Sequence, residues 1–176
     1  MSLNSFMPAD LLMAIEFAYT PSGLICQHLL KEAESREYGA CVFEIHHRRI
    51  KFRVAKITPT KLGQFVTLWK RMEDGVIGPH DLVDPIDFFV VGVRNAQHMG
   101  QFVFPKEVLF EKGIVSQAGR GGKRAMRIYP PWDITDSRQA KKTQAWQLPY
   151  FFEIHPHQNI PKTSIQAVRK LFHCGP

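Results

Sequence analysis

The sequence predicts a single α/β domain in which helices flank a mixed central sheet. Residues 87–93 form a near-continuous apolar run of strand length, which is typical of a strand covered on both faces. Residues 40–58 alternate as two strands joined by a short turn. Helix-type patterns precede and follow them at residues 8–34 and 163–172. With 176 residues and 44% hydrophobic content, the chain can fill one core, and nothing requires a second domain.

The first half of the chain begins with a helical pattern that the break Pro21-Ser22-Gly23 divides, which predicts helices near residues 9–19 and 24–34. Strands are then expected at 40–46 and 49–58, with the turn at His47-Arg48. Residues 61–70 suggest a helix or an irregular segment after a possible cap at 58–60. Residues 74–85 are rich in Gly, Pro, His and Asp, so they predict a loop.

The second half starts from the buried strand at 87–93, and a turn at 95–100 gives it a hairpin partner. Pro105 and Gly113 bound a short helix, and Ser137 is a plausible cap for a longer one that ends before Pro149. The elements expected here are strand 101–104, helix 106–112, loop 116–123, strand 124–129, helix 137–147, strand 150–154, linker 155–161 and helix 163–172.

The charge balance favours an anionic partner. There are 23 Lys and Arg against 16 Asp and Glu, a net charge of +7, and the sequence pI is near 9.5. Such a balance suits phosphate contacts and counterion release. The densest cluster is Arg120, Lys123, Arg124 and Arg127, whose glycine neighbours could leave backbone amides open to phosphate oxygens. The alternative is a solvated turn with ordinary surface charge.

The cysteines indicate a reducing compartment, and the hydropathy gives no sign of a membrane span. Cys26, Cys41 and Cys174 are odd in number and far apart, so they form neither a disulfide framework nor a zinc motif. No stretch approaches the ~20 apolar residues that a membrane span needs. We therefore expect a cytoplasmic protein with no membrane partner. The histidine pairs also lack the spacing of a structural zinc site.

One candidate site lies on the paired strands. Ile50, Phe52, Val54 and Lys56 share a face of the second strand, so Lys56 ends an apolar stripe and needs an anion or solvent. Glu44 on the first strand is the nearest acid. The two side chains could form a simple cross-strand ion pair, or they could belong to a phosphate-handling site.

Several blocks of sequence resemble the MepB-like family, small bacterial proteins first noticed beside a multidrug efflux gene. The blocks are FEIHHRRIKFRVAKITPTKLGQFV, DFFVVGV, GQFVFPKEVLFEKGI, GKRAMRIYPPWD and QAKKTQAWQ, and the resemblance runs over residues 38–151. It implies a bacterial cytoplasmic setting and names no reaction.

The order of elements also resembles, more distantly, the PD-(D/E)xK (restriction-endonuclease-like) nucleases. By that resemblance the motif lysine falls on Lys56 and the first acid on Glu44, but the second acid falls on Val54, which cannot bind a cation. Asp87, on a neighbouring strand, would then have to supply the missing ligand. The resemblance implies that Glu44 and Asp87 hold Mg²⁺ and that Lys56 contacts the phosphate. Loss of hydrolysis with retained strand binding is the other reading.

We therefore expect nucleic-acid binding, with single strands favoured because aromatic faces stack on unpaired bases. Among the aromatic residues, Trp132 is the candidate for stacking, whereas Trp146 is expected in the core. The alternative is an efflux-operon accessory module that receives an anionic small molecule or an acidic protein partner. The residues predicted to contact nucleic acid are Lys51, Arg53, Lys61, Lys106, Arg120, Lys123, Arg124, Arg127 and Trp132.

Overall fold

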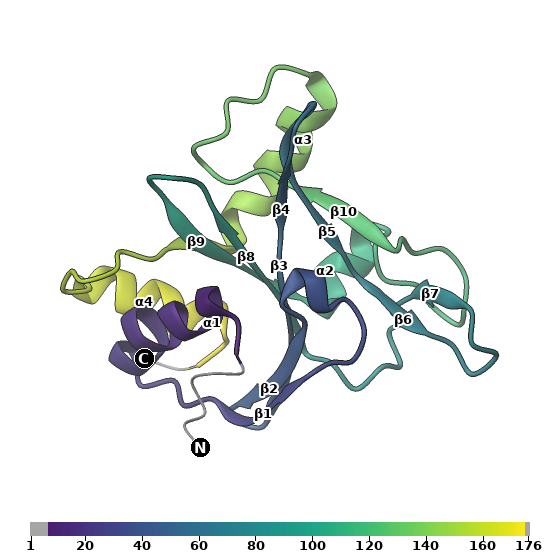
Figure 1. Ribbon diagram of the computed structural model, residues 1–176, viewed down its shortest axis with the longest axis horizontal. Coiled ribbons are helices and arrows are strands. Elements are labelled where there is room, and N and C mark those ends of the chain that lie inside the picture. The colour runs from purple at the N-terminus through teal and green to yellow at the C-terminus, as the bar shows by residue number, and fades with distance from the viewer. Residues whose placement is uncertain (1–6, 175–176) are drawn as a thin grey trace.

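A computed structural model describes residues 7–174 of the chain. It consists of two sheets, a small hairpin and several helices (Figure 1). In chain order the elements are α1 (Ala9–Ala14), a π-helical turn η2 (Ile15–Tyr19), η3 (Thr20–Ser22), β1 (Gln27–Lys31), η4 (Arg36–Tyr38), β2 (Cys41–Ile45), β3 (Arg48–Val54), β4 (Lys56–Thr58), β5 (Lys61–Thr67), β6 (Trp69–Arg71), β7 (Ile77–Pro79), β8 (Phe88–Arg94), β9 (Met99–Pro105), α2 (Lys106–Glu111), β10 (Ala125–Ile128), α3 (Arg138–Gln147), η5 (Leu148–Tyr150), β11 (Phe151–Glu153) and α4 (Lys162–Leu171).

The larger sheet is mixed, as predicted, and has the strand order β1-β2-β3-β8-β9-β11. β3 and β8 run parallel, with Ile50 opposite Phe88 and Phe52 opposite Val90, while the other neighbours are antiparallel. The smaller sheet has the order β10-β5-β4, and β6 pairs with β7.

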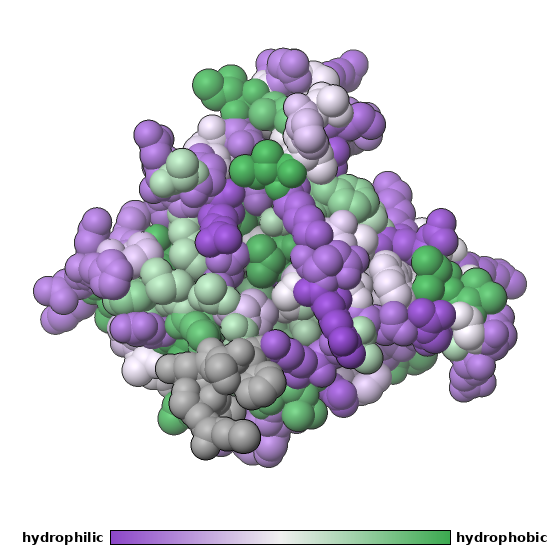
Figure 2. Space-filling view, viewed as in Figure 1, coloured by the Kyte–Doolittle hydropathy of each residue, from purple (hydrophilic) through white to green (hydrophobic). Residues whose placement is uncertain are grey.

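Two apolar cores lie on opposite faces of the larger sheet. On one face, α1, η2 and α4 cover residues such as Phe43 and Phe88, and Tyr19 and Phe172 contribute rings to this core. On the other face, the smaller sheet, α2 and α3 cover Val91 and its neighbours (Figure 1). Seen from the same side, hydrophilic and apolar residues are interspersed over the surface, with apolar groups at the upper and right-hand ends as well as near the middle (Figure 2).

The prediction of a strand at residues 87–93 that is covered on both faces is confirmed by β8. Val90 faces the core under α1 and α4, whereas Phe89 and Val91 face the opposite core, and all three have no exposed surface. The uninterrupted apolar run therefore reflects a strand with two buried faces.

The prediction of a helix over residues 24–34 is wrong. Gly23, at a φ of +71°, ends the N-terminal helical segment, and β1 then runs antiparallel to β2. β1 is an edge strand with mostly exposed residues, so its sequence carries no clear apolar stripe of either period. Pairing with the open edge of β2 decides its structure, which is a tertiary effect that local propensity does not contain.

The strand predicted over residues 49–58 divides into two. β3 ends at Val54, the amide of Ala55 donates to the Gly92 carbonyl at 2.8 Å, and β4 then joins the smaller sheet. The helix suggested for residues 61–70 is also wrong, because β5 and β6 occupy this segment. Gly63, at a φ of +81°, has a backbone conformation that a helix does not allow.

The loop predicted over residues 74–85 contains the short strand β7, which pairs with β6. Other elements agree more closely with the sequence. The Ser137 hydroxyl accepts a hydrogen bond from the Ala140 amide at 3.1 Å and begins α3, as its capping role predicts. The β2–β3 turn is shifted by one residue from the prediction. Its central residues are His46 and His47, both with positive φ, as two-residue hairpin turns require. Within residues 7–174, no helix combines the length and the apolar character that crossing a bilayer requires.

Candidate nucleic-acid interface

Glu44 and Lys56 do not meet. Glu44 lies opposite Arg49 near the β2–β3 turn, and its carboxylate contacts His28 Nδ1 at 3.1 Å. Val54, at the other end of β3, is about 16 Å from Arg49 along the strand, and Lys56 lies beyond it in another sheet. The Lys56 ammonium lies 4.4 Å from the centre of the Tyr38 ring, a cation–π contact. Neither the simple ion pair nor the phosphate site expected from these two residues is formed.

Asp87 lies at the same end of the sheet as Glu44, but Arg49 separates them. The Asp87 carboxylate accepts a hydrogen bond from the Arg49 amide at 2.8 Å, and Glu44 lies two strands away, about 10 Å. Over the described part of the chain, no group of three or more His, Cys, Asp or Glu side chains is arranged to hold a metal ion. The shared magnesium site expected from Glu44 and Asp87 therefore does not assemble in this arrangement.

Lys51 and Arg53 point away from α1 and α4 but are not groove cations. The Lys51 ammonium lies 2.7 Å from a Glu32 carboxylate oxygen, and Arg53 forms an ion pair with the other oxygen of Glu32. Arg53 is 1% exposed. Burial lowers the pKa of Lys51, which Glu32 opposes. These two cations belong to a buried charged cluster and are not available to a nucleic-acid backbone on the surface.

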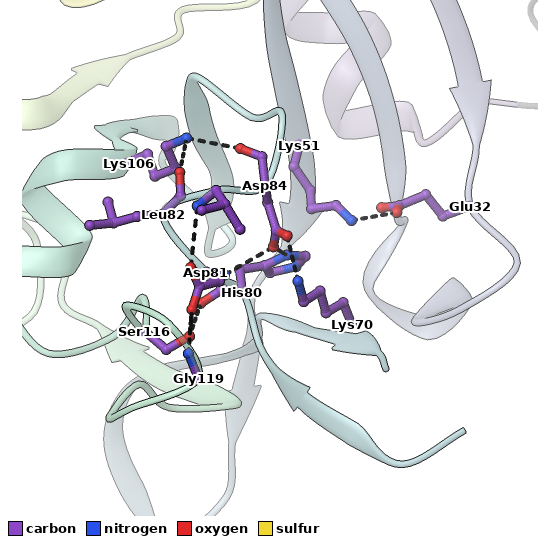
Figure 3. A network of polar contacts seen from close by, with 11 residues as sticks. Glu32, Lys51, Lys70, His80, Asp81, Leu82, Asp84, Lys106, Ser116 and Gly119 are labelled. Carbon is purple, nitrogen blue, oxygen red and sulfur yellow. Dashed lines mark hydrogen bonds and ion pairs between the residues drawn. The ribbon is translucent and has the colours of Figure 1, made fainter. Parts of the chain in front are cut away.

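Lys106 and the glycine-rich loop are also held internally (Figure 3). The Lys106 ammonium donates to the carbonyl oxygens of Leu82 and Asp84 at 2.7 and 2.8 Å. The Gly119 amide donates to the Asp81 carboxylate at 3.0 Å, and the Ser116 hydroxyl donates to it at 2.7 Å. These hydrogen bonds lower the pKa of Asp81 to about 2. The Gly119 amide, expected to face a phosphate, therefore serves a carboxylate of the protein.

Trp132 and Lys61 lie beside each other in a small cavity of about 150 Å³. The Trp132 ring stacks on His98, with centroids 5.1 Å apart and planes at 15°, and it also contacts Phe151. One face of the Trp132 ring is therefore already covered by a protein side chain. Arg120 and Arg124 are exposed, at the glycine-rich loop and just before β10.

A larger groove lies between α2, β10 and α3, and we call it the basic groove. Its volume is about 580 Å³. It is lined by basic side chains, by two aromatic rings, and by the polar residues Gln139 and Thr143, with Glu111 as an acidic member. The four cations are Lys112, Lys123, Arg127 and Lys142, and the two rings are Tyr129 and Trp146.

The cations of the basic groove keep their charge uncompensated. Within residues 7–174, none of the four forms an ion pair with a carboxylate. The Arg127 guanidinium donates only to neutral acceptors, the Gly63 carbonyl at 3.1 Å and the Thr58 hydroxyl at 3.0 Å among them. These bonds fix the side chain while leaving its positive charge available to an anion.

Trp146 connects the groove to the core. Its ring packs against the buried Phe104, with centroids 5.4 Å apart, so one side of the ring has the core contact that the sequence predicts. The same ring lines the groove, where the Lys112 ammonium lies 5.7 Å from its centroid. Partly exposed aromatic rings beside cations are typical of grooves in which the bases of a single strand stack.

The sequence interpretation identified Lys123 and Arg127 but missed Lys112 and Lys142. A signal for Lys142 was present, because Gln139, Lys142, Thr143 and Trp146 follow the i, i+3, i+4, i+7 spacing of one helix face. Lys112 gave no such signal. It enters the groove because β9 and α2 place the end of α2 beside α3, a contact between distant segments.

Comparison with known proteins identifies the family. The MepB-like family model matches residues 32–153, which is more than half of the chain. The chain belongs to the MepB-like family. Its structure is similar to a crystal structure of MepB, with a TM-score of 0.72 and 31% sequence identity over 87% of this chain and 97% of that chain.

A second solved structure, a bacterial homing endonuclease, is only weakly similar. Its TM-score is 0.43 and its identity 17%, over 84% of this chain and 93% of that chain. No protein among the curated sequences matches the chain significantly. The family is therefore settled by the MepB-like match, and the function has to be argued from the site.

Proposed function

We propose that this MepB-like protein binds single-stranded nucleic acid in the basic groove. The observation that carries the proposal is the set of four cations without carboxylate partners around Tyr129 and Trp146. Cations supply contacts to backbone phosphates that do not depend on sequence, and aromatic rings supply stacking for bases that are not paired. Both features are needed for a single strand, and both line the same groove.

Polar groups complete the groove. Gln139 and Thr143 can hydrogen-bond to phosphate, sugar or base edges, and Glu111 lies on the α2 side with Lys112. The groove is held together by neighbouring elements. β5 holds β10 in the smaller sheet, and the side-chain amide of Gln147, at the end of α3, donates a hydrogen bond to the Arg127 carbonyl of β10 at 2.8 Å. The two walls of the groove are therefore fixed relative to one another.

The proposal is for binding without hydrolysis. Hydrolysis by the PD-(D/E)xK arrangement needs an acid pair and a lysine at one phosphate. Here Lys56 is on a different sheet from Glu44 and Asp87, and Arg49 lies between the two acids. We expect a labelled oligonucleotide to stay intact when it is incubated with the protein and Mg²⁺.

The test is the salt dependence of oligonucleotide binding. With four phosphate contacts, log K for a single strand should fall with log salt with a slope of about −2.8, so affinity drops about 50-fold between 50 and 200 mM. Fluorescence anisotropy of a labelled 12-nucleotide single strand measures this, with the duplex of the same sequence as a comparison. Absence of binding at 50 mM salt, or tighter binding of the duplex, would overturn the proposal. A mononucleotide that competes as strongly as the oligonucleotide would point instead to an anionic small molecule.

A further inference from the structure

A second polar cavity lies on the same side of the larger sheet as the smaller sheet, next to β3, and we call it the charged cavity (Figure 3). Its volume is about 220 Å³. It is bounded by β3, β6 and the segment 80–86, and its charged or titratable lining residues are Glu32, Arg49, Lys51, Lys70, His80 and Asp84. It shares no lining residue with the basic groove.

The charged cavity has more cations than carboxylates. Lys51 and Arg53 share the single carboxylate of Glu32. Lys70 pairs with Asp84, which also contacts His80 Nδ1 at 3.2 Å. Arg49 lies at the rim and forms no ion pair with a carboxylate of the described residues. Three cations and two carboxylates therefore line the cavity, and Arg53, outside the lining, shares one of these carboxylates.

Two buried polar atoms of this charged cluster have no hydrogen-bond partner among the described residues. They are Nε2 of His80, which lines the cavity, and Nε of Arg53, which does not line it but pairs with the lining residue Glu32. Arg53 is 1% and His80 2% exposed, so solvent does not satisfy them readily. An Arg Nε–H can only donate, so it requires an acceptor. His80 Nδ1 donates to the Asp84 carboxylate, so Nε2 of the neutral ring is an acceptor and requires a donor, such as water or the hydroxyl of a protonated phosphate. Unsatisfied buried polar atoms are rare in folded proteins.

The surroundings of Lys51 indicate the same excess of positive charge. Burial lowers its pKa, and the nearby Arg53 acts in the same direction, against the effect of Glu32. The pKa of His80 is likewise lowered by burial, with Lys51 and Arg53 contributing. An anion in the cavity would offset the positive charge around both Lys51 and His80.

We propose that the charged cavity binds a phosphate group. The volume is below the range of about 300–1,000 Å³ usual for sites that enclose a larger ligand, so a single small oxyanion is the best fit. Lys51, Lys70 and Arg49 all line the cavity, and their ammonium and guanidinium groups can supply charge-assisted donors to an oxyanion. The phosphate can be inorganic or the terminal monoester of a nucleotide or oligonucleotide. The site stands apart from the proposed function, because none of its residues is part of the basic groove.

The experiment uses inorganic phosphate as the probe, at constant ionic strength maintained with chloride. Thermal unfolding should show a saturable rise in Tm for the full chain, since a ligand that binds only the folded state stabilises it. Lys70→Met should weaken binding about tenfold or more, because a charge-assisted bond is lost. Glu32→Gln should strengthen phosphate binding, because the internal competitor for Lys51 is removed. This variant is also expected to be less stable, so its affinity is measured from the phosphate-dependent rise above its own Tm without phosphate. Lys61→Met, on β5 and outside the cavity, serves as the matched control and should behave as the wild type.

The site predicts that phosphate affinity falls in Lys70→Met and rises in Glu32→Gln. A general loss of stability would not change the two affinities in opposite directions. A Tm that does not depend on phosphate, or an equal rise in all four proteins, would overturn the proposal.

A second experiment distinguishes inorganic phosphate from a terminal phosphate monoester by comparing a 5′-phosphorylated dinucleotide with its 5′-hydroxyl form. Tighter binding of the phosphorylated form than of inorganic phosphate identifies a terminal monoester as the ligand, and the reverse identifies free phosphate. If Lys70→Met abolishes phosphate binding but leaves binding of a 5′-hydroxyl oligonucleotide unchanged, the two sites are independent.

Discussion

Replacing Glu32 by Gln is expected to lower the free energy of unfolding by about 3–5 kcal/mol, because Arg53 and Lys51 would then remain buried without a carboxylate. Arg53 is 1% exposed and cannot reach solvent without moving the chain around it. A domain of this size has roughly 5–15 kcal/mol of stability, so this one substitution should remove a large share of it while leaving the protein folded at low temperature.

Urea unfolding followed by circular dichroism measures this effect. Glu34→Gln is the matched control, since Glu34 forms an ion pair with Arg71 at 2.8 Å and both side chains are about half exposed. Solvent screens that exposed pair, so its loss should change the free energy of unfolding little. The double variant Glu32→Gln with Arg53→Met should lose less stability than the sum of the single variants, because it removes both charges. A loss below 1 kcal/mol for Glu32→Gln would contradict the buried cluster.

Reversing the charge of Lys123 and Lys142 together should lower the affinity for a single-stranded oligonucleotide by about 100-fold near 100 mM salt. The two residues come from opposite walls of the basic groove, one before β10 and one on α3. Their loss also removes two phosphate contacts, so the salt slope should become about 1.4 less steep. Fluorescence anisotropy across a salt series measures both quantities.

The control for this variant carries the same change in net charge elsewhere. Lys162 and Lys170 are exposed on α4, which covers the opposite face of the larger sheet. Reversing both to Glu changes the overall charge equally but leaves the basic groove intact. If binding depended on net charge alone, the two double variants would weaken binding equally. Equal weakening would contradict the proposal that the basic groove is the binding site.

The elements best predicted from the sequence are those for which a short segment contains the signal, either a pattern of burial or a helix cap. The run at 87–93 identifies β8, and Ser137 identifies the start of α3. Prediction from the sequence fails at β1 and at β5, because β1 is set by pairing with β2 and β5 by pairing with β10, which is distant along the chain. Lys56 illustrates the consequence. A continuous strand would place it beside the apolar stripe of β3, but the chain leaves the larger sheet at Ala55 and carries it away.

The two polar sites were predictable to different degrees. Lys123, Arg127 and the nearby aromatic rings are close in sequence, so part of the basic groove could be anticipated from residues 123–146. The charged cavity could not. Lys51 and Arg53 alternate on one face of β3 and suggest surface cations, and only the course of the chain after β1 brings Glu32 to them. The segment 80–86 then closes over the cluster, and this depends on the hydrogen bonds of Lys106 and Asp81.

Photocrosslinking tests the central claim, that a single strand lies in the basic groove, most directly. A single-stranded oligonucleotide that contains 5-iodouracil is irradiated in complex with the full chain, and the modified residues are identified by mass spectrometry. The account predicts crosslinks to Trp146 and Tyr129, the two rings of the groove. Crosslinks confined to Trp132 or Tyr38, both outside the groove, would contradict it.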